Sequence, residues 1–338
     1  MNMECHAPAE GPVLQELKDF LQGLGLDWDE GNTFTALMRD DSGRLIATAS
    51  LDGHVVKCVG VLPAWRGGAI TGQLMTRLRE EAHSRGAESL LLYTRPEHQN
   101  AFERLGFYLV EKTDDVMLME DRPDGVARWL ETLPRPQKGI VGAIVANCNP
   151  MTNGHLYLIQ KARLLCDQLY LFVVSEEKSE IPAADRLEIV RQATADMPGV
   201  VVCPSGDYLV SAATFPDYFL PDQDDAQRLG CELDLKLFAH QIAAPLGISR
   251  RFVGQEPYSP LTSRYNLCMK EILPEYGVSL VEFSRLRAGD KGYVNAATVR
   301  QLWRDGWYDA LTAMVPDASL SYMKAHPIAE APKTGYIK

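Results

Sequence analysis

The sequence has little of what disulfide-rich, zinc-binding and nucleic-acid-binding proteins need. Its seven cysteines are scattered over 338 residues and none forms a C-x-x-C pair, so the sequence predicts neither a disulfide framework nor a zinc site. Lysine and arginine total 34 against 45 aspartates and glutamates, which gives a net charge of -11. Because nucleic acids are bound by clustered basic charge, we expect no nucleic-acid partner. A nucleotide, which needs only a few cations and backbone amides, is not excluded.

Long apolar runs are also missing. None approaches the ~18 to 20 residues that span a bilayer, and residues 1–11 lack the charged start and apolar core of a signal peptide. We therefore expect a cytoplasmic protein without a membrane partner. The chain is 46% hydrophobic and 23% charged, which is typical of a soluble globular protein, and its length suggests two domains.

The best candidate linker is LPRPQKG at 133–139, which carries two prolines and no periodicity. Before it, strand-like runs separated by turn residues, followed by a helix at about 70–84, predict an antiparallel meander in an α+β domain over residues 1–133. After it, strands and helices alternate, as in a parallel sheet with crossover helices. The sequence therefore predicts a Rossmann-like α/β domain over residues 134–338.

The segment IVANCNPMTNGHLYLIQKA joins an apolar strand to a helix through a turn, where open α/β sheets place their ligands. The helix start offers free N–H groups, and Gly154 lets a phosphate approach the backbone. Thr152 and His155 lie near the first turn and are candidate catalytic residues, because both can point toward the same anion. A protonated or donating imidazole would stabilise charge on an α-phosphate. Asn147 and Asn149 are further candidate contacts to ATP. Alternatively, the threonine is only a helix cap, the histidine is an exposed first-turn residue and the asparagines form turns.

These residues resemble the nucleotidyltransferase superfamily with the (H/T)-x-G-H signature, and more specifically the citrate lyase ligase family. The resemblance continues, in order, through FVVSEEKSEIPAADR (172–186), PSGDYLVSAATFPDYFL (204–220), RFVGQEPYSPLTSRYN (251–266) and MKEILPEYG (269–277). It implies an enzyme that uses ATP to convert acetate to acetyl-adenylate and releases pyrophosphate. The acetyl group then passes to the prosthetic-group thiol of the citrate lyase acyl carrier subunit, and AMP leaves. Magnesium is expected with the nucleotide, carried mainly by the phosphates and not by a protein metal site.

Three further residues are candidate contacts to the nucleotide, because they follow later strands and lie in segments that resemble the family. Lys178 would neutralise phosphate charge as pyrophosphate develops. Gly254 would let the ribose of ATP lie close to the backbone, and Glu256 would bind its hydroxyls. For the two charged residues, a solvated loop side chain is the alternative.

The superfamily's second phosphate motif, I-S-S-T-x-(I/V)-R, aligns with VNAATVR at 294–300. Arg300 and the hydrophobic positions match the motif, while Asn295 replaces the first serine and alanines occupy the next two polar positions. Thr298 is a further candidate contact to the nucleotide. Asn295 can still donate a hydrogen bond, and the helix N-terminus remains. We therefore expect a weakened phosphate site in which Arg300 acts as a clamp; a salt bridge on the helix surface is the alternative for Arg300.

Residues 32–120 resemble the GNAT acetyltransferase fold. The turn RGGAIT lies where that fold holds the coenzyme A pyrophosphate, so Arg66, Gly67 and Gly68 are candidate contacts to a coenzyme A-like arm. However, the usual Q/R-x-x-G-x-G/A pattern keeps only Arg66, and no general base is evident. The domain is therefore a structural remnant, an active acetyl-CoA site or a docking site for the coenzyme A-like arm of the acyl carrier.

Three other functions stay open. The same chemistry could act on the acyl carrier of malonate decarboxylase. An adenylyltransferase of the phosphopantetheine type would join ATP to a phosphate monoester without any dependence on acetate. A nucleotide sensor without catalytic activity is suggested by the missing hydroxyls of the second phosphate motif.

Overall fold

The computed structural model describes residues 1–67, 69–136, 138–175, 179–209, 219, 223–257, 259–286 and 293–328. Contacts divide the chain into two compact units, of which the first comprises residues 1–129 and a later segment that ends at Leu237. Within that segment, α7 (Gln223–Leu237) packs against β6 (Tyr108–Lys112), and Lys236 Nζ donates to the carbonyl of Lys112 at 3.0 Å. The domain boundary at 133/134 stays a prediction, with the difference that α7 belongs to the first unit.

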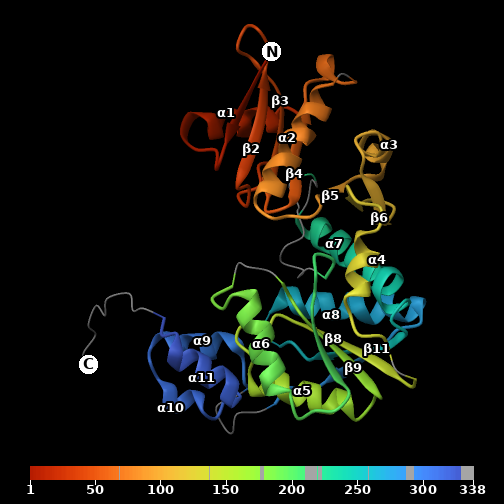
Figure 1. Cartoon of the computed structure of the whole chain (residues 1–338), viewed down its shortest axis with the longest axis vertical. Coiled ribbons are helices and arrows are strands. Elements are labelled where there is room, and N and C mark those ends of the chain that lie inside the picture. Colours follow the sequence, from red (N-terminus) through yellow and green to blue (C-terminus); the bar gives the residue numbers. More distant parts are fainter. Residues whose placement is uncertain are drawn as a thin grey trace. The chain divides into compact units, whose positions relative to one another are not determined.

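The first unit is built on a seven-stranded sheet with the order β1-β2-β3-β4-β5-β7-β6 (Figure 1). Its neighbouring strands are antiparallel except for the parallel pair β4–β5. The remaining elements are β1 (Asn2–His6), α1 (Gly11–Gln22), β2 (Phe34–Arg39), β3 (Leu45–Asp52), β4 (Val55–Val61), α2 (Ile70–Ser84), β5 (Leu91–Thr94), α3 (Gln99–Glu103), β7 (Met117–Glu120) and α4 (Gly125–Glu131).

The core of the first unit lies between its sheet and α2. Leu74, Met75 and Leu78 of this helix are fully buried and pack on the same cluster as Ala36 and Ile46. The predicted meander is confirmed by the antiparallel pairs β2–β3 and β3–β4. Strand β1 was not predicted, because its exposed and half-buried residues show no apolar pattern and are ordered by backbone pairing with β2.

Strands β4 and β5 separate soon after they begin to pair. Their register contains only Val55 with Leu91 and Val56 with Leu92, so the later residues of β4 have no backbone partners in β5. A wedge-shaped gap therefore opens between these two strands in the middle of the sheet.

The second unit is built on a five-stranded sheet with the order β10-β9-β8-β11-β12, and every pair is parallel. Figure 1 shows α5 and α6 along one face of this sheet, where Ile159 and Ile189 join the core cluster of Ile144 and Phe252. Its elements are β8 (Val141–Ala146), α5 (Asn153–Arg163), β9 (Gln168–Val173), α6 (Ala183–Ala193), β10 (Val200–Pro204), a π-helix (Phe238–Ala243), β11 (Ile248–Gly254), α8 (Pro260–Ile272), β12 (Ser279–Phe283), α9 (Ala296–Arg304), α10 (Tyr308–Leu311) and α11 (Asp317–Ala325).

The predicted fold class is confirmed: an α+β unit with a mixed sheet precedes a parallel α/β unit. In the second unit the chain first builds outward from β8 to β9 and β10, then returns to the other side of β8 with β11. This reversal makes the carboxyl ends of β8 and β11 a topological switch point, which is where such sheets bind ligands. Among the described residues, no helix has the length and apolar character to cross a bilayer.

Candidate active site

A cavity of about 670 Å³ opens at the switch point between β8 and β11. Three helices begin at it: α5 is capped by Thr152, α8 by Ser259 and α9 by Asn295, and all three caps line the cavity. Helix N-termini present free N–H groups and the positive end of the helix dipole. The cavity is therefore suited to an anionic ligand of nucleotide size.

A reciprocal cap holds the imidazole of His155. The Thr152 hydroxyl accepts the His155 backbone N–H at 3.4 Å, and the Thr152 backbone N–H donates to His155 Nδ1 at 3.0 Å. Because Nδ1 accepts this hydrogen bond, the proton of the neutral ring is on Nε2. Thr152 is thus a helix cap, as the alternative interpretation had it, and this cap orients the histidine.

The imidazole is neutral in the free protein. Burial, together with the nearby Arg285 guanidinium, lowers the pKa of His155 to about 4. Of the two states considered from the sequence, protonated or donating, the structure therefore favours a neutral ring that donates from Nε2. His155 lines the cavity and can offer this hydrogen bond to an anion there.

Two glycines of the cavity wall leave room for a ligand. A Cβ on Gly154 would meet the Thr152 hydroxyl at 3.4 Å and the Val294 carbonyl at 3.6 Å, which are ordinary contacts, and a Cβ on Gly254 would meet nothing within 4 Å. Neither glycine is therefore required by the packing of the protein around it.

We expect Gly154→Ala to fold normally and to bind ATP roughly ten- to a hundredfold more weakly, because its methyl group would overlap a phosphate that lies against the backbone. Calorimetric titration with ATP measures the effect. Gly72→Ala in α2 is the matched control, since its Cβ would approach only Leu105 at 3.8 Å. Unchanged ATP affinity in Gly154→Ala would show that no phosphate passes over this position.

The start of α9 is organised by Asn295. Its Oδ1 accepts the backbone N–H of Thr298 at 2.8 Å, and its Nδ2 donates to the Tyr293 carbonyl at 3.5 Å. Asn295 lines the cavity together with Ala296 and Ala297, whereas Thr298 is not among the lining residues. The amide that the sequence assigned to phosphate binding is thus used as a cap, and the helix start itself faces the cavity.

Arg300 reaches the cavity from the second turn of α9 and is held by two partners. Its Nη1 donates to the Asn149 carbonyl at 2.6 Å, and its Nε lies 3.3 Å from Glu180 Oε1, which also pairs with Arg304. Burial raises the pKa of Glu180, but the hydrogen bond from Asn149, together with a backbone hydrogen bond and these guanidinium groups, keeps it below its ordinary value. Arg300 therefore forms the salt bridge of the alternative interpretation and still lines the cavity.

Asn149 lies next to the cavity and has another role in the structure. Its side chain donates to Glu180 at 2.8 Å and accepts from the Ile181 backbone N–H at 3.3 Å, and the residue is not among those that line the cavity. Its contact with ATP stays a prediction.

Glu256 belongs to a charged pair at the cavity wall that includes Arg285, which the sequence analysis missed. One carboxylate oxygen accepts from Arg285 Nη2 and the other from the Ser259 backbone N–H at 3.2 Å, and the Glu256 side chain is only 12% exposed. It is therefore not a solvated loop carboxylate. Its position in the sequence could have indicated Arg285, because it lies two residues after β12, at the carboxyl edge of the sheet.

A second residue that the sequence analysis missed is Arg186 of α6, which holds the chain segments next to the cavity by hydrogen bonds. It is fully buried and donates to the carbonyls of Val174 at 2.7 Å, Ile181 at 3.0 Å and Asn147 at 2.8 Å, and also to the Asn147 side chain. These bonds join the chain segments that leave β8 and β9. Asn147 lines the cavity with its side-chain oxygen engaged by Arg186.

Two predicted residues, Lys178 and Gly68, lie outside the described residues. Within the parts of the chain that the structure describes, no three His, Cys, Asp or Glu side chains form a cluster that could hold a metal ion.

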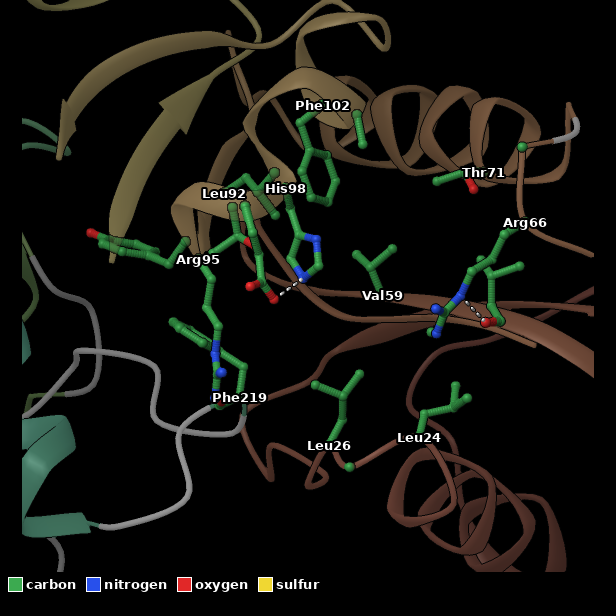
Figure 2. A pocket seen from close by; sticks show the side chains of 18 residues that line it. Leu24, Leu26, Val59, Arg66, Thr71, Leu92, Arg95, His98, Phe102 and Phe219 are labelled. Carbon is green, nitrogen blue, oxygen red and sulfur yellow. Dashed lines mark hydrogen bonds and ion pairs between the residues drawn. The ribbon is translucent and has the colours of Figure 1, made fainter. Parts of the chain in front are cut away.

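The first unit has a cavity of about 570 Å³ at the wedge between β4 and β5. Figure 2 shows Arg66 and Arg95 on opposite sides of it, with Val59 between them. Arg66 Nε donates to the Val61 carbonyl at 3.2 Å, and Arg95 Nη2 donates to the Phe219 carbonyl at 3.1 Å. Gly67 also lines this cavity, so the structure brings together the two described residues predicted to contact a coenzyme A-like arm.

Solved structures are similar to parts of the chain. Escherichia coli ElaA is 17% identical and aligns with 36% of this chain and 99% of its own, with a TM-score of 0.32. Thermotoga maritima TmcAL, solved with alpha-thio ATP, is 16% identical over 55% of each chain, with a TM-score of 0.36.

Curated relatives align with most of the chain. The citrate (pro-3S)-lyase ligase of Escherichia coli K12 is 36% identical over 325 residues, which cover 94% of this chain and 92% of the relative. That of Haemophilus influenzae is 33% identical over 323 residues, with 93% and 96% covered. The family model for the citrate lyase ligase C-terminal domain matches residues 141–323. This agreement, over nearly the whole length and over the unit that holds the larger cavity, shows that the chain belongs to the citrate lyase ligase family.

Proposed function

We propose that this protein uses ATP to acetylate the prosthetic-group thiol of the citrate lyase acyl carrier subunit. The observation that carries the proposal is the capped His155 beside Gly154 at the start of α5, inside a cavity where three helices begin. The relatives named citrate (pro-3S)-lyase ligase support a ligase that acts on citrate lyase. Acetate, acetyl-adenylate and the thiol acceptor follow from the family resemblance of the sequence.

In the first step, a carboxylate oxygen of acetate attacks the α-phosphorus of ATP while the bond from that phosphorus to the bridging oxygen breaks and pyrophosphate leaves. The Nε2–H of His155 donates to a non-bridging α-phosphate oxygen as charge develops there. Arg300 and the N-terminus of α9 bind the phosphates that leave. Magnesium would bind with the nucleotide, held mainly by its phosphate oxygens, which are hard ligands of the kind that this ion prefers.

In the second step, the thiolate of the carrier's prosthetic group attacks the acetyl carbonyl carbon. A carbon–sulfur bond forms, the bond to the adenylate oxygen breaks, and AMP leaves with its electron pair. Adenylation makes this step possible, because it turns a poor electrophile, acetate, into one with a good leaving group. Arg285 and Arg300 line the cavity and would supply positive charge where the hydroxyls of the second phosphate motif are missing.

The test is ATP–pyrophosphate exchange with and without acetate. We expect exchange that depends on acetate, because pyrophosphate is released only when a carboxylate attacks. Exchange without acetate, with a dinucleotide product from a phosphate monoester, would instead indicate an adenylyltransferase, and ATP binding without exchange would indicate a sensor. Labelled acetate offered with the citrate lyase carrier and with the malonate decarboxylase carrier decides between the two protein partners.

We further propose that the wedge cavity of the first unit binds the coenzyme A-like arm. Its support is the part of β4 that does not pair with β5 and that lines the cavity together with Arg66. A strand edge and a guanidinium suit an amide-rich, anionic arm. We expect Arg66→Ala to raise the KM for the carrier about tenfold, the effect of losing one charge-assisted hydrogen bond, and to leave ATP–pyrophosphate exchange intact. Arg44→Ala, at an exposed position of the same unit, is the control. Equal loss of exchange and transfer would indicate a structural role.

A further inference from the structure

Arg251, in the middle of β11, is a buried charge whose hydrogen bonds are incomplete. The residue is 4% exposed and lines the switch-point cavity. Among the described residues, no hydrogen-bond acceptor contacts its Nε or Nη1. Its guanidinium carbon lies 4.3 Å from the centre of the Phe238 ring, a cation–π contact that satisfies none of its N–H groups.

Such an arrangement is costly in a protein without ligand. Removing a guanidinium from water without an anion or hydrogen-bond acceptor is strongly unfavourable. Two nearby glutamates, one just after β11 and one in the neighbouring β12, have other partners: Glu256 pairs with Arg285 and Glu282 pairs with Lys270. The missing acceptor is therefore expected from a ligand that enters the cavity.

The chemistry of the ligand follows from the guanidinium. Its planar fork of donors matches a carboxylate or a phosphate. The phosphates of ATP already have a place at the carboxyl edge of the sheet, where α5 and α9 begin beside His155 and Arg300. Arg251 lies three residues before Gly254, the last residue of β11, and thus deeper than this edge. The ligand that remains for it is the acid that ATP activates.

We propose that Arg251 binds the carboxylate of a small monocarboxylic acid substrate inside the switch-point cavity. The inference rests on the proposed function and assigns the residue that recognises the acid. One carboxylate oxygen accepts from the guanidinium, and the other keeps a lone pair free to attack the α-phosphorus. The positive charge also offsets the repulsion between the incoming carboxylate and the phosphate oxygens. No proton is transferred in this step.

The test compares Arg251→Met and Arg251→Lys with Arg250→Met. Arg250 is the neighbour on β11, and its guanidinium donates to the Leu165 carbonyl, so its substitution serves as the control. In ATP–pyrophosphate exchange, we expect Arg251→Met to raise the KM for acetate roughly ten- to a hundredfold, the loss of hydrogen bonds to a charged group, with the KM for ATP within about twofold of wild type. The KM for acetate of Arg251→Lys should lie between those of wild type and Arg251→Met. Lysine keeps the positive charge but lacks the planar set of donors of the guanidinium.

Direct binding separates this inference from the proposed function. Saturation-transfer NMR with acetate and a non-hydrolysable ATP analogue should show acetate bound to wild type and to Arg250→Met, and not to Arg251→Met. Wild-type exchange that does not depend on acetate would overturn the proposed function, whereas the NMR measurement tests acetate binding at Arg251 without relying on exchange.

Three results would overturn the assignment of Arg251. The first is acetate binding that Arg251→Met leaves unchanged. The second is a raised KM for ATP with an unchanged KM for acetate, together with loss of thermal stabilisation by inorganic phosphate, which would make the site a phosphate site. The third applies if Arg251→Met does not fold: an acetate KM in Arg251→Lys equal to that of wild type would then contradict the role.

Discussion

His155→Ala is expected to lower the rate of acetate-dependent ATP–pyrophosphate exchange by roughly 10²- to 10³-fold, the usual cost of removing one donor to a developing anion. The donor is the Nε2–H of a neutral imidazole whose Nδ1 is occupied by the Thr152 backbone N–H at 3.0 Å. Because the transition state carries more charge at the α-phosphate than bound ATP does, kcat should fall and ATP affinity should change little. His326→Ala, at an exposed position of the same unit, is the control. Unchanged exchange in His155→Ala would remove the residue from the mechanism.

The same prediction includes the pH behaviour of His155. Its pKa in the folded protein is lowered to about 4 from an ordinary value of 6.5, so the unfolded chain takes up this proton first as the pH falls. The stability linked to the neutral ring is therefore fully present above pH 6.5 and is lost progressively as the pH falls toward 4. The NMR titration of the His155 ring in the free protein should have its midpoint near pH 4. A midpoint near 6.5 would mean that the ring is solvated and not fixed by the cap.

Arg186→Met is expected to reduce the free energy of unfolding of the second unit by about 3–5 kcal/mol, the range for breaking buried hydrogen-bonded charge networks. The fully buried guanidinium donates hydrogen bonds to the carbonyls of Asn147, Val174 and Ile181. In the variant, each of these carbonyls would lose this donor. Urea denaturation followed by circular dichroism measures the change. The matched control is Arg191→Met, at an exposed position of the same helix, α6.

Arg186→Lys should be nearly as destabilising, because one ammonium group lacks the fork that reaches several acceptors. A loss of less than about 1 kcal/mol in Arg186→Met, the level of an exposed interaction, would show that water replaces the guanidinium. Exchange activity in the part of the population that stays folded should also fall, since Asn147 at the cavity wall loses its anchor.

The two units and most of their elements were predictable because periodicity and turn residues act locally. The apolar run before Asn147, the turn that contains Pro150 and the glycine at 154 specify a strand, a turn and a helix from neighbouring residues alone. His155 and Arg300, predicted separately, line one cavity. They do so because parallel strands bring their carboxyl ends to the same edge of the sheet.

Other parts of the site were not predictable from local pattern. Arginine is ordinarily a surface residue, and nothing in the residues around Arg186, Arg251 or Arg285 shows that the fold buries or half-buries them. Similarly, the asparagine of the second phosphate motif was expected to donate to a phosphate, whereas its side-chain oxygen caps α9 through the Thr298 backbone N–H. Whether an asparagine side chain caps a helix or contacts a ligand depends on atomic positions that differ by a few ångströms, and local sequence does not specify these.

The sequence by itself determined the fold class, the place of the switch-point cavity and the family, because these depend on the order of apolar runs, turns and motifs along the chain. Only the tertiary structure decided the charge state of His155, the pairing of Glu256 with Arg285 and the isolation of Arg251. The physical reason is that pKa values and ion pairs depend on burial and on partners from strands and helices far apart in sequence. Folding alone brings these partners together.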